Sequence, residues 1–354
     1  MSKNSYIPES VNIELTLACN LRCLHCGSGA GKARKGELEF GEFKNLFKGL
    51  QKLGCKEVCL LGGEPFLRKD WYEIGASARD CGMEIVFITN GWTINRKIID
   101  GLKRLGKISR IGVSLDGASP EIHDKIRGRK GSFERAWKSA LMLRDAGFET
   151  GVITTLSKLN FSQIEPMKDL LFGMNITWQL QVASPHGLRF NKELVLDRLE
   201  FYEAGKKISH YRNTIPANDL PVCGSHDFGY FSSFLTRYGE LPEWHGCSAG
   251  IHTLGIMSDG SVKGCLCQHD DFIEDNIRKR NIEEIWNDEK LFSRNRKFRY
   301  SMLEGTCKGC KYGNECRAGC SNLSYTITGL IYDNPYCFHA IERDILNFNR
   351  TNKK

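Results

Sequence analysis

The chain has 354 residues and a formal net charge of +8, with 41% hydrophobic and 26% charged residues. This length suits one large α/β domain, or a large domain with a smaller one attached. No apolar run approaches the 18 or so residues that a membrane span needs, and the N-terminal residues lack the apolar core of a signal peptide. Lysine and arginine are scattered rather than arranged in a stripe. We therefore expect a cytoplasmic protein that binds neither a membrane nor nucleic acid.

Short β-rich runs alternate with longer amphipathic runs from residue 12 to about residue 183, which is typical of repeated βα units. The predicted strands are residues 12–17, 58–61, 84–89, 111–115, 151–156 and 177–183. Helical stretches between them include residues 41–54, 71–82, 132–147 and 162–173. Six units are too few for a closed eight-fold barrel, so the pattern favours either an incomplete barrel or an open doubly wound sheet.

Four of these strands lead directly into loops that carry cysteine, glycine or acidic residues. The loops are TLACNLRCLHC after the first strand, GGEPF after the second, TNG after the third and SLDG after the fourth. In both candidate architectures the active site forms at the C-terminal ends of the strands. The four loops therefore predict one shared site.

The fifteen cysteines are unlike a disulfide framework, because ten of them cluster and we expect a reducing compartment. Cys19, Cys23 and Cys26 form the first cluster, with the spacing C-x3-C-x2-C. Three thiolates in one loop can bind three irons of a 4Fe-4S cluster, which leaves the fourth iron open for chemistry. Buried thiols and a partial zinc site are the alternatives for this cluster.

The spacing of these three cysteines, with His25 just before the last one, resembles the signature of the radical S-adenosylmethionine (radical SAM) family. The resemblance implies a partial (β/α)6 TIM-type barrel. It also implies that the open iron binds S-adenosylmethionine and that one electron from the cluster cleaves it to a 5'-deoxyadenosyl radical. In this family the radical removes a hydrogen atom from an unactivated C–H bond.

Other motifs of the first half resemble the parts of this family that contact S-adenosylmethionine. GGEP, with Gly62, Gly63 and Glu64, is similar to the loop that meets the methionyl amino group, and its glycines allow close backbone approach. Ser114 and Asp116 in SLDG resemble the ribose-side motif, and Arg127 is placed like the arginine that contacts the methionyl carboxylate. A plain turn at GGEP and a capping role for Asp116 are the alternatives.

A second set of seven cysteines has the spacing Cys247-x12-Gly260-x4-Cys265 and Cys307-x2-Cys310-x5-Cys316-x3-Cys320, with Cys337 after a further sixteen residues. This set resembles the SPASM extension, which holds two auxiliary iron–sulfur clusters in radical SAM enzymes that act mostly on peptides and proteins. The resemblance assigns the outer cluster to Cys307, Cys310, Cys316 and Cys337. It assigns the inner cluster to Cys247, Cys265 and Cys320. The expected cofactors are thus three 4Fe-4S clusters and S-adenosylmethionine; a zinc site in CKGCKYGNEC is the alternative.

The inner set has only three assigned ligands. Some relatives provide a fourth cysteine six residues before the position matched by Cys247, where this chain has Leu241. Cys223 is the first candidate for the missing ligand, Cys267 is a second, and an open site that binds a substrate donor is the third alternative.

We expect Cys55, Cys59 and Cys81 to be structural, because free cysteine is among the most buried residue types. His269, Asp270 and Asp271 follow Cys265 closely and are weak candidates for a catalytic base, with solvated loop charge as the alternative. Sulfatase-maturing relatives place an acidic base directly after the cysteine matched by Cys265. Leu266 stands there in this chain, which argues against formylglycine formation.

The expected organisation has four parts. They are a radical SAM barrel core at residues 1–185, a helical or irregular bridge at 186–240, a small cysteine-rich SPASM domain at 241–345 and a basic tail at 346–354. About 11 residues precede the first strand, so we expect no fused leader-binding domain at the N-terminus.

The predicted function is hydrogen abstraction from a peptide or protein side chain, leading to a crosslink, a thioether, an epimer or an oxidised residue. A small-molecule substrate, such as an aminoglycoside-type alcohol or a tetrapyrrole carboxylate, is the alternative. An iron–sulfur electron carrier or sensor is the third reading. The expected partners are a peptide or protein substrate, a reductant such as flavodoxin or ferredoxin, and, if a leader must be recognised, a separate leader-binding protein.

Overall fold

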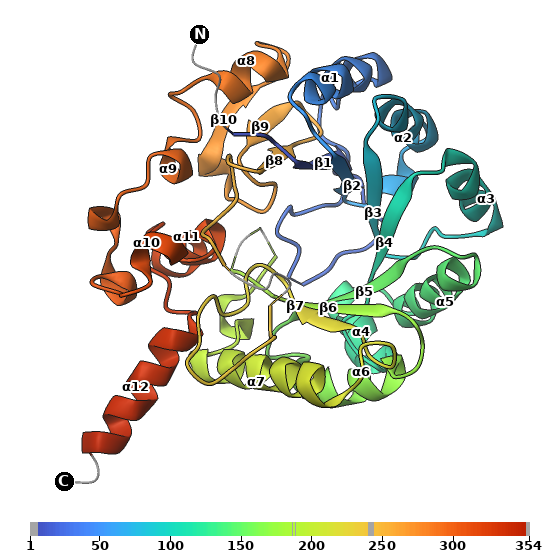
Figure 1. Cartoon of the computed structure of the whole chain (residues 1–354). Coiled ribbons are helices and arrows are strands. Elements are labelled where there is room, and N and C mark those ends of the chain that lie inside the picture. The colour runs from blue at the N-terminus through green and yellow to red at the C-terminus, as the bar shows by residue number, and fades with distance from the viewer. Residues whose placement is uncertain (1–5, 186, 188, 240–243, 352–354) are drawn as a thin grey trace.

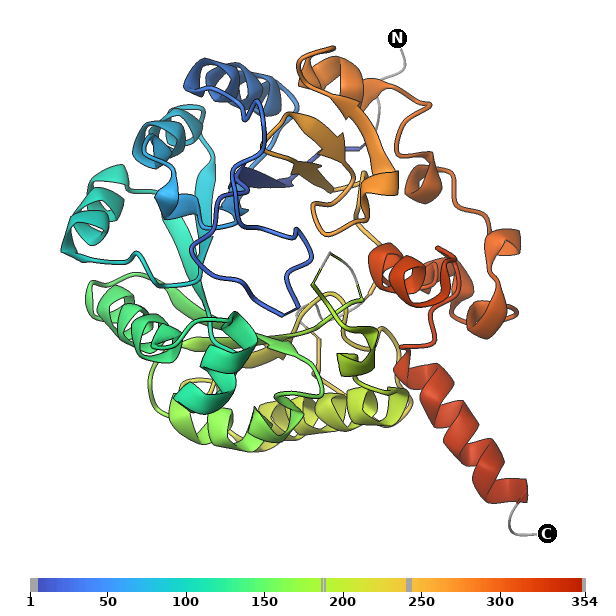
Figure 2. The ribbon, with the colours of Figure 1, turned by 180° about the vertical axis from the view of Figure 1, so that it is seen from behind.

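The computed structural model describes residues 6–185, 187, 189–239 and 244–351. Leu241 lies outside the described residues. The described part of the chain has no helix that is both long enough and apolar enough to cross a membrane. Figures 1 and 2 show a ring of strands surrounded by helices, with the C-terminal helix projecting from one side.

All six predicted strands are present, and they are adjacent parallel strands of one sheet. Their bounds are β1 Ser10–Thr16, β2 Glu57–Gly62, β3 Glu84–Thr89, β4 Ile108–Ser114, β5 Thr150–Leu156 and β6 Thr177–Val182. Parallel strands must be joined by crossovers, and these are provided by helices on the outer face of the sheet (Figure 1). The crossover helices are α1 Phe40–Lys52, α2 Trp71–Asp80, α3 Arg96–Leu105, α4 Pro120–Arg127, α5 Ser132–Asp145 and α6 Ile164–Leu171. The prediction of a partial barrel is confirmed.

Four short strands extend this sheet beyond the predicted six. They are β7 Val222–Gly224, β8 Thr253–Ile256, β9 Ser261–Lys263 and β10 Ile273–Asn276. The order across the sheet is β10-β9-β8-β1-β2-β3-β4-β5-β6-β7, so β7 and β10 are its two edges. Strands β7 and β8 are parallel to their neighbours β6 and β1, whereas β9 and β10 are antiparallel.

The new strands come from segments expected to be outside the barrel. The predicted irregular bridge contains α7 Arg198–Thr214 and β7, and the cysteine-rich region provides β8 to β10. Residues 346–351, expected in a basic tail, continue α12 Phe338–Thr351. The remaining helices are short: α8 Ile282–Asn287, α9 Ser293–Arg296, α10 Gly313–Cys316 and α11 Ser321–Thr328.

The core lies between the sheet and its helices. Alternate residues of β1, Val11, Ile13 and Leu15, are fully buried and belong to the same cluster as Phe43 and Phe47 of α1. The cluster continues into β8, because Ile256 pairs with Ile13 and is also fully buried. The cysteine-rich region and the barrel therefore share one hydrophobic core.

Replacing Ile256 by alanine should destabilise the whole sheet. The substitution removes a fully buried side chain, and such changes cost about 2–5 kcal/mol. Urea unfolding should show this loss in a single transition. Leu330→Ala is the control, because Leu330 is 42% exposed and its loss should change stability by no more than about 0.5 kcal/mol. A separate early transition for the C-terminal region, with the barrel unaffected, would contradict a shared core.

Candidate active site

The first three cysteines lie in the loop that follows β1, at the C-terminal edge of the sheet. Each sulfur accepts a hydrogen bond from a nitrogen. The pairs are Leu21 N to Cys19 Sγ (3.4 Å), Arg127 Nη1 to Cys23 Sγ (3.7 Å) and Ala30 N to Cys26 Sγ (3.3 Å). Such donors favour the thiolate form, which is the form that binds metal. In the metal-free protein burial outweighs them, and it raises the pKa of Cys19 to about 11 and also raises the pKa of Cys23.

The end of α4 fixes the shape of this loop. Leu24 N donates to the carbonyl of Ile126 (2.8 Å), and Arg22 N donates to that of Arg127 (3.2 Å). Gly128 follows with φ +67°, and a Cβ there would lie 2.5 Å from the carbonyl oxygen of Arg22. Only glycine tolerates both the conformation and the close approach. The loop is thus held in position by backbone contacts that do not depend on a bound cluster.

A fully buried carboxylate, Asp116, connects the cysteine loop to β4. Its Oδ2 pairs with Arg127 Nε at 2.6 Å and with His25 Nε2 at 2.8 Å, and its Oδ1 accepts Thr155 N at 3.0 Å. Burial opposes the charged form, but Arg127 and then His25 outweigh burial and lower the pKa of Asp116. The same ion pair raises the pKa of Arg127 against the effect of burial.

His123 supports Asp116 from the backbone side. It is buried, and its Nδ1 accepts the N–H of Asp116 at 3.1 Å. Burial lowers the pKa of His123 to about 4, so the ring is neutral near pH 7. Sequence reasoning did not select His123, because a single histidine in an amphipathic helix is normally a core residue.

Three of the residues expected to contact S-adenosylmethionine, His25, Asp116 and Arg127, are bound to one another. Ser114 is the last residue of β4 and pairs with Ile153 of β5, two residues before Asp116. The structure brings all four to the C-terminal edge of β4 beside the cysteine loop. Their contacts with the cofactor stay a prediction.

The two glycines of GGEP lie against the end of β1. A Cβ at Gly62 would be 2.3 Å from Thr16 O, and one at Gly63 would be 2.2 Å from Ala18 O. The N–H groups of Gly63 and Glu64 donate to these carbonyls at 2.7 and 2.9 Å. Because the N–H of Gly63 already donates to Thr16 O, the backbone group of Gly63 that remains for a ligand is its carbonyl oxygen. A carbonyl oxygen is an acceptor and suits an ammonium group.

The side chain of Glu64 connects the β2 and β3 ends. It is fully buried, and it accepts Thr89 Oγ1 and Asn90 N, each at 2.8 Å. Asn90 in turn donates to Cys19 Sγ at 3.7 Å. Burial raises the pKa of Glu64 to about 7, although these hydrogen bonds oppose the shift.

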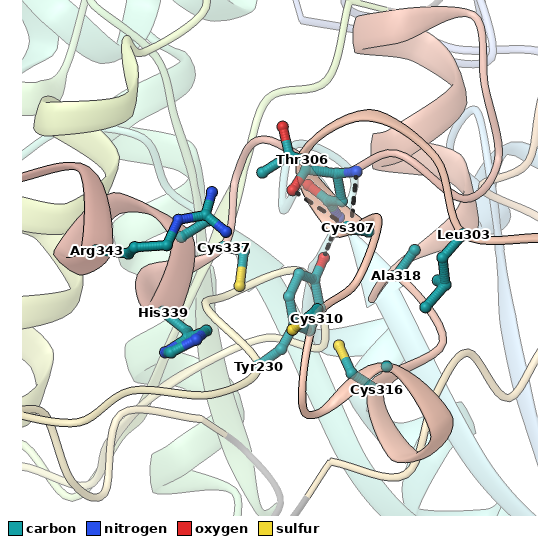
Figure 3. A pocket seen from close by; sticks show the side chains of 13 residues that line it. Tyr230, Leu303, Thr306, Cys307, Cys310, Cys316, Ala318, Cys337, His339 and Arg343 are labelled. Carbon is teal, nitrogen blue, oxygen red and sulfur yellow. Dashed lines mark hydrogen bonds between the residues drawn. The ribbon is translucent and has the colours of Figure 1, made fainter. Parts of the chain in front are cut away.

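The four cysteines assigned to the outer cluster line one pocket. Figure 3 shows the sulfurs of Cys310, Cys316 and Cys337 turned toward the same space. Cys307 Sγ accepts the N–H of Asn334 at 3.4 Å. Tyr230, Leu303 and Ala318 also line this space, so its wall is largely apolar.

The three cysteines assigned to the inner cluster are connected by Ser321 and Gln268, which are both buried. Cys247 Sγ lies 3.3 Å from Ser321 Oγ, and Gln268 Nε2 donates to the same Oγ at 3.3 Å. Cys265 N donates to Gln268 Oε1 at 3.0 Å, and Cys320 directly precedes Ser321 at the start of α11. The predicted inner set is therefore brought together by the fold.

Two further side chains lie at this inner set. Cys267 is hydrogen-bonded to Cys265, and His226 is hydrogen-bonded to the sulfur of Cys320. The sequence reasoning missed His226, because it stands alone in an irregular segment with no ligand spacing around it. Cys223 lies in β7, opposite Gln179 and close to Arg212 of α7.

The candidate bases His269, Asp270 and Asp271 have side chains that are 40%, 62% and 57% exposed. Asp270 pairs with Lys263 at 3.2 Å, and Asp271 accepts the hydroxyl of Tyr325 at 2.6 Å. This arrangement is what the alternative reading, solvated loop charge, describes. A catalytic role for the three residues stays a prediction.

Among the described residues, no three His, Cys, Asp or Glu side chains converge closely enough to hold a single metal ion. The outer cysteines instead surround a cavity. A zinc ion needs four ligands at about 2.0–2.3 Å from one point, whereas an iron–sulfur cube holds its cysteines farther apart. Four cysteines are a donor set that an iron–sulfur cluster takes, and the choice of a cluster over zinc stays a prediction. Cys55 and Cys59 are buried as expected, and Cys81 is partly buried.

Two family profiles match the sequence. The radical SAM superfamily matches residues 13–171, and SPASM, an iron–sulfur cluster-binding domain, matches residues 247–311. An AdoMet-dependent heme synthase of Methanosarcina barkeri is 31% identical, over 94% of this chain and 97% of the relative. Mycofactocin maturase MftC of Mycobacterium tuberculosis is 28% identical, over 93% of this chain and 82% of the relative.

The fold is similar to that of Streptococcus suis SuiB bound to S-adenosylmethionine. The TM-score is 0.72 with 18% identity, and the match covers 94% of this chain and 76% of SuiB. At 18% identity, this match shows only that the two proteins share a fold.

Replacing Asp116 by asparagine should destabilise the protein by about 3–5 kcal/mol, because it leaves the Arg127 charge buried without its partner. Urea unfolding measures this loss. Asp80→Asn is the matched control, because Asp80 pairs with Arg79 at 2.8 Å but its side chain is 66% exposed. That change should cost no more than about 1 kcal/mol. Equal losses in the two variants would contradict a supporting role for Asp116.

Glu64 should make stability depend on pH. Its folded pKa of about 7 lies above the ordinary value near 4.3, so the folded chain holds a proton that the unfolded chain has released between these values. The stabilisation is complete below pH 4.3 and is lost as pH rises to about 7. Unfolding of the metal-free chain between pH 5.5 and 8 should show this decline. In Glu64→Gln the decline should be smaller, and parallel curves for both proteins would contradict the prediction.

Proposed function

Because the chain belongs to the radical SAM superfamily and carries a SPASM domain, we propose that it abstracts a hydrogen atom from a substrate C–H bond, with three 4Fe-4S clusters. The main support for this proposal is the loop of Cys19, Cys23 and Cys26, in which each sulfur accepts a hydrogen bond from an N–H group. When bound there, the cluster and S-adenosylmethionine supply one-electron cleavage chemistry that yields a 5'-deoxyadenosyl radical. The protein supplies position and electrostatics.

The chain's own groups suit the two ends of an amino acid. The backbone acceptor at Gly63 suits a methionyl ammonium, and the Arg127 guanidinium suits its carboxylate. Asp116 holds Arg127 at 2.6 Å, so this cation keeps its position and its charge. An electron carrier has no use for such an arrangement beside its cluster, which argues against a carrier or sensor.

Our first proposal for the substrate is a peptide or protein side chain. It is supported by the SPASM domain and by the similarity to the maturase MftC over 93% of this chain. The products proposed are a crosslink, a thioether, an epimer or an oxidised residue. A reductant such as flavodoxin or ferredoxin and, where a leader is present, a separate leader-binding protein complete the proposed partners.

A tetrapyrrole carboxylate is the second candidate, and a specific observation favours it. The AdoMet-dependent heme synthase and an Fe-coproporphyrin III synthase, both of Methanosarcina barkeri, are each 31% identical to this chain. The match with the heme synthase covers 97% of the length of that protein.

Anaerobic reconstitution should give about twelve irons per chain, as three 4Fe-4S clusters require. With S-adenosylmethionine and dithionite, the protein should then release 5'-deoxyadenosine, measured by liquid chromatography. Replacing Cys19, Cys23 and Cys26 together by alanine should abolish this product and remove about four irons. Cys81→Ala, a partly buried cysteine outside every cluster, is the control and should change neither. An unchanged yield in the triple variant would rule out the proposed chemistry.

The two substrate classes can be separated directly. The enzyme is incubated with iron-coproporphyrin III in one reaction, and is co-expressed with a peptide encoded next to its gene in another. Mass spectrometry should show a mass change in the peptide if the first proposal holds. Loss of carboxyl groups from the porphyrin, with no change in the peptide, would replace the first proposal by the second.

A further inference from the structure

We propose that Cys267 is the fourth ligand of the inner auxiliary cluster, together with Cys247, Cys265 and Cys320. This proposal rests on the proposed function, because it assumes that the inner cluster exists. It gives that cluster four protein ligands and hence no vacant iron. The inner cluster would then carry electrons and would not bind a substrate donor.

The geometry of the turn at 265–268 places Cys267 beside the assigned ligands. Gln268 N donates back to Cys265 O at 3.1 Å, which closes a tight turn between the two cysteines. The turn lies against β8, where a Cβ at Gly255 would be 2.4 Å from Leu266 N. Leu266 therefore lies against the sheet, between the two cysteines.

Cys267 is exposed, and two members of the inner set are among its neighbours. Its side chain is hydrogen-bonded to Cys265, and Cys320, Asp227 and Lys263 are close enough for their charges to interact with it. Cys320 interacts in the same way with Cys247. The four cysteines therefore form one group, which the Gln268 and Ser321 hydrogen bonds hold together.

The candidate first favoured by the sequence, Cys223, occupies a different place. It is the central residue of β7, where Gln179 is opposite it and Arg212 is close. His226 comes three residues later and is hydrogen-bonded to Cys320. Because His226 already contacts the sulfur of Cys320, we assign it the role of positioning that sulfur and not the role of an iron ligand.

The test uses the full chain with Cys19, Cys23 and Cys26 replaced by alanine, so that only the auxiliary clusters contribute to the signal. After anaerobic reconstitution, this parent should hold about eight irons, and the electron paramagnetic resonance (EPR) spectrum of the reduced clusters should not change when cyanide is added. Cyanide binds an iron only where a coordination position is vacant.

Adding Cys267→Ala to the parent should produce a cyanide-dependent change in the spectrum or the loss of about four irons. Cys223→Ala and His226→Ala should each keep eight irons and stay insensitive to cyanide. Circular dichroism checks folding, and Cys267→Ser provides a second variant that keeps the size of the side chain and should also alter the spectrum.

Three results would overturn the assignment. They are a cyanide response in the parent, an unaltered spectrum in both Cys267 variants, or an effect of Cys223→Ala that matches the one expected for Cys267→Ala. A parent that holds four irons or fewer would instead show that the proposed pair of auxiliary clusters is wrong. That result concerns the proposed function and is distinguishable from the first three, because it appears before any change at Cys267.

Discussion

The buried ion pair between Asp116 and Arg127 is the interaction on which the candidate site depends. Both side chains are almost fully removed from solvent, and burying such charges is costly unless each has a partner. Arg127 also donates to Cys23, and Asp116 also holds His25. Two charges therefore join the end of β4, the end of α4 and the cysteine loop. Contacts within the chain therefore hold the cysteine loop against β4 and α4.

The parts of the fold that the sequence predicted are those with strong local signals. Six parallel strands with crossover helices follow from hydrophobic periodicity, and the cysteine sets follow from spacing. Strands β7 and β8 have only three and four residues, which is too short to show a hydrophobic periodicity. Strand β7, Val222–Gly224, also directly follows a proline. Their strand conformation comes from pairing with β6 and β1, which lie far away in the sequence.

The candidate site also has features that the sequence predicts and features that it does not. Ligand types and their grouping could be predicted, because closely spaced cysteines are typical of metal and iron–sulfur sites. The contacts among His25, Asp116 and Arg127 could not, because they join residues 91 and 11 positions apart through the folded sheet. His226 and Gln268 carry no motif at all. Their roles follow only from the tertiary structure, in which the segment after β7 and the 265–268 turn both contact the start of α11.

The shared sheet has a mechanical consequence. Strand β8 is hydrogen-bonded to β1 along Ser10–Ile13, and the cysteine loop follows directly from that same β1. The turn with Cys265 follows β9, which pairs with β8. Among the described residues, the N-terminal cysteine loop and the Cys265 turn are thus joined through β1, β8 and β9, and a hinge between them would have to break this ladder. Electron tunnelling between clusters held at these two places would take place over a span set by the sheet itself, independent of any domain closure.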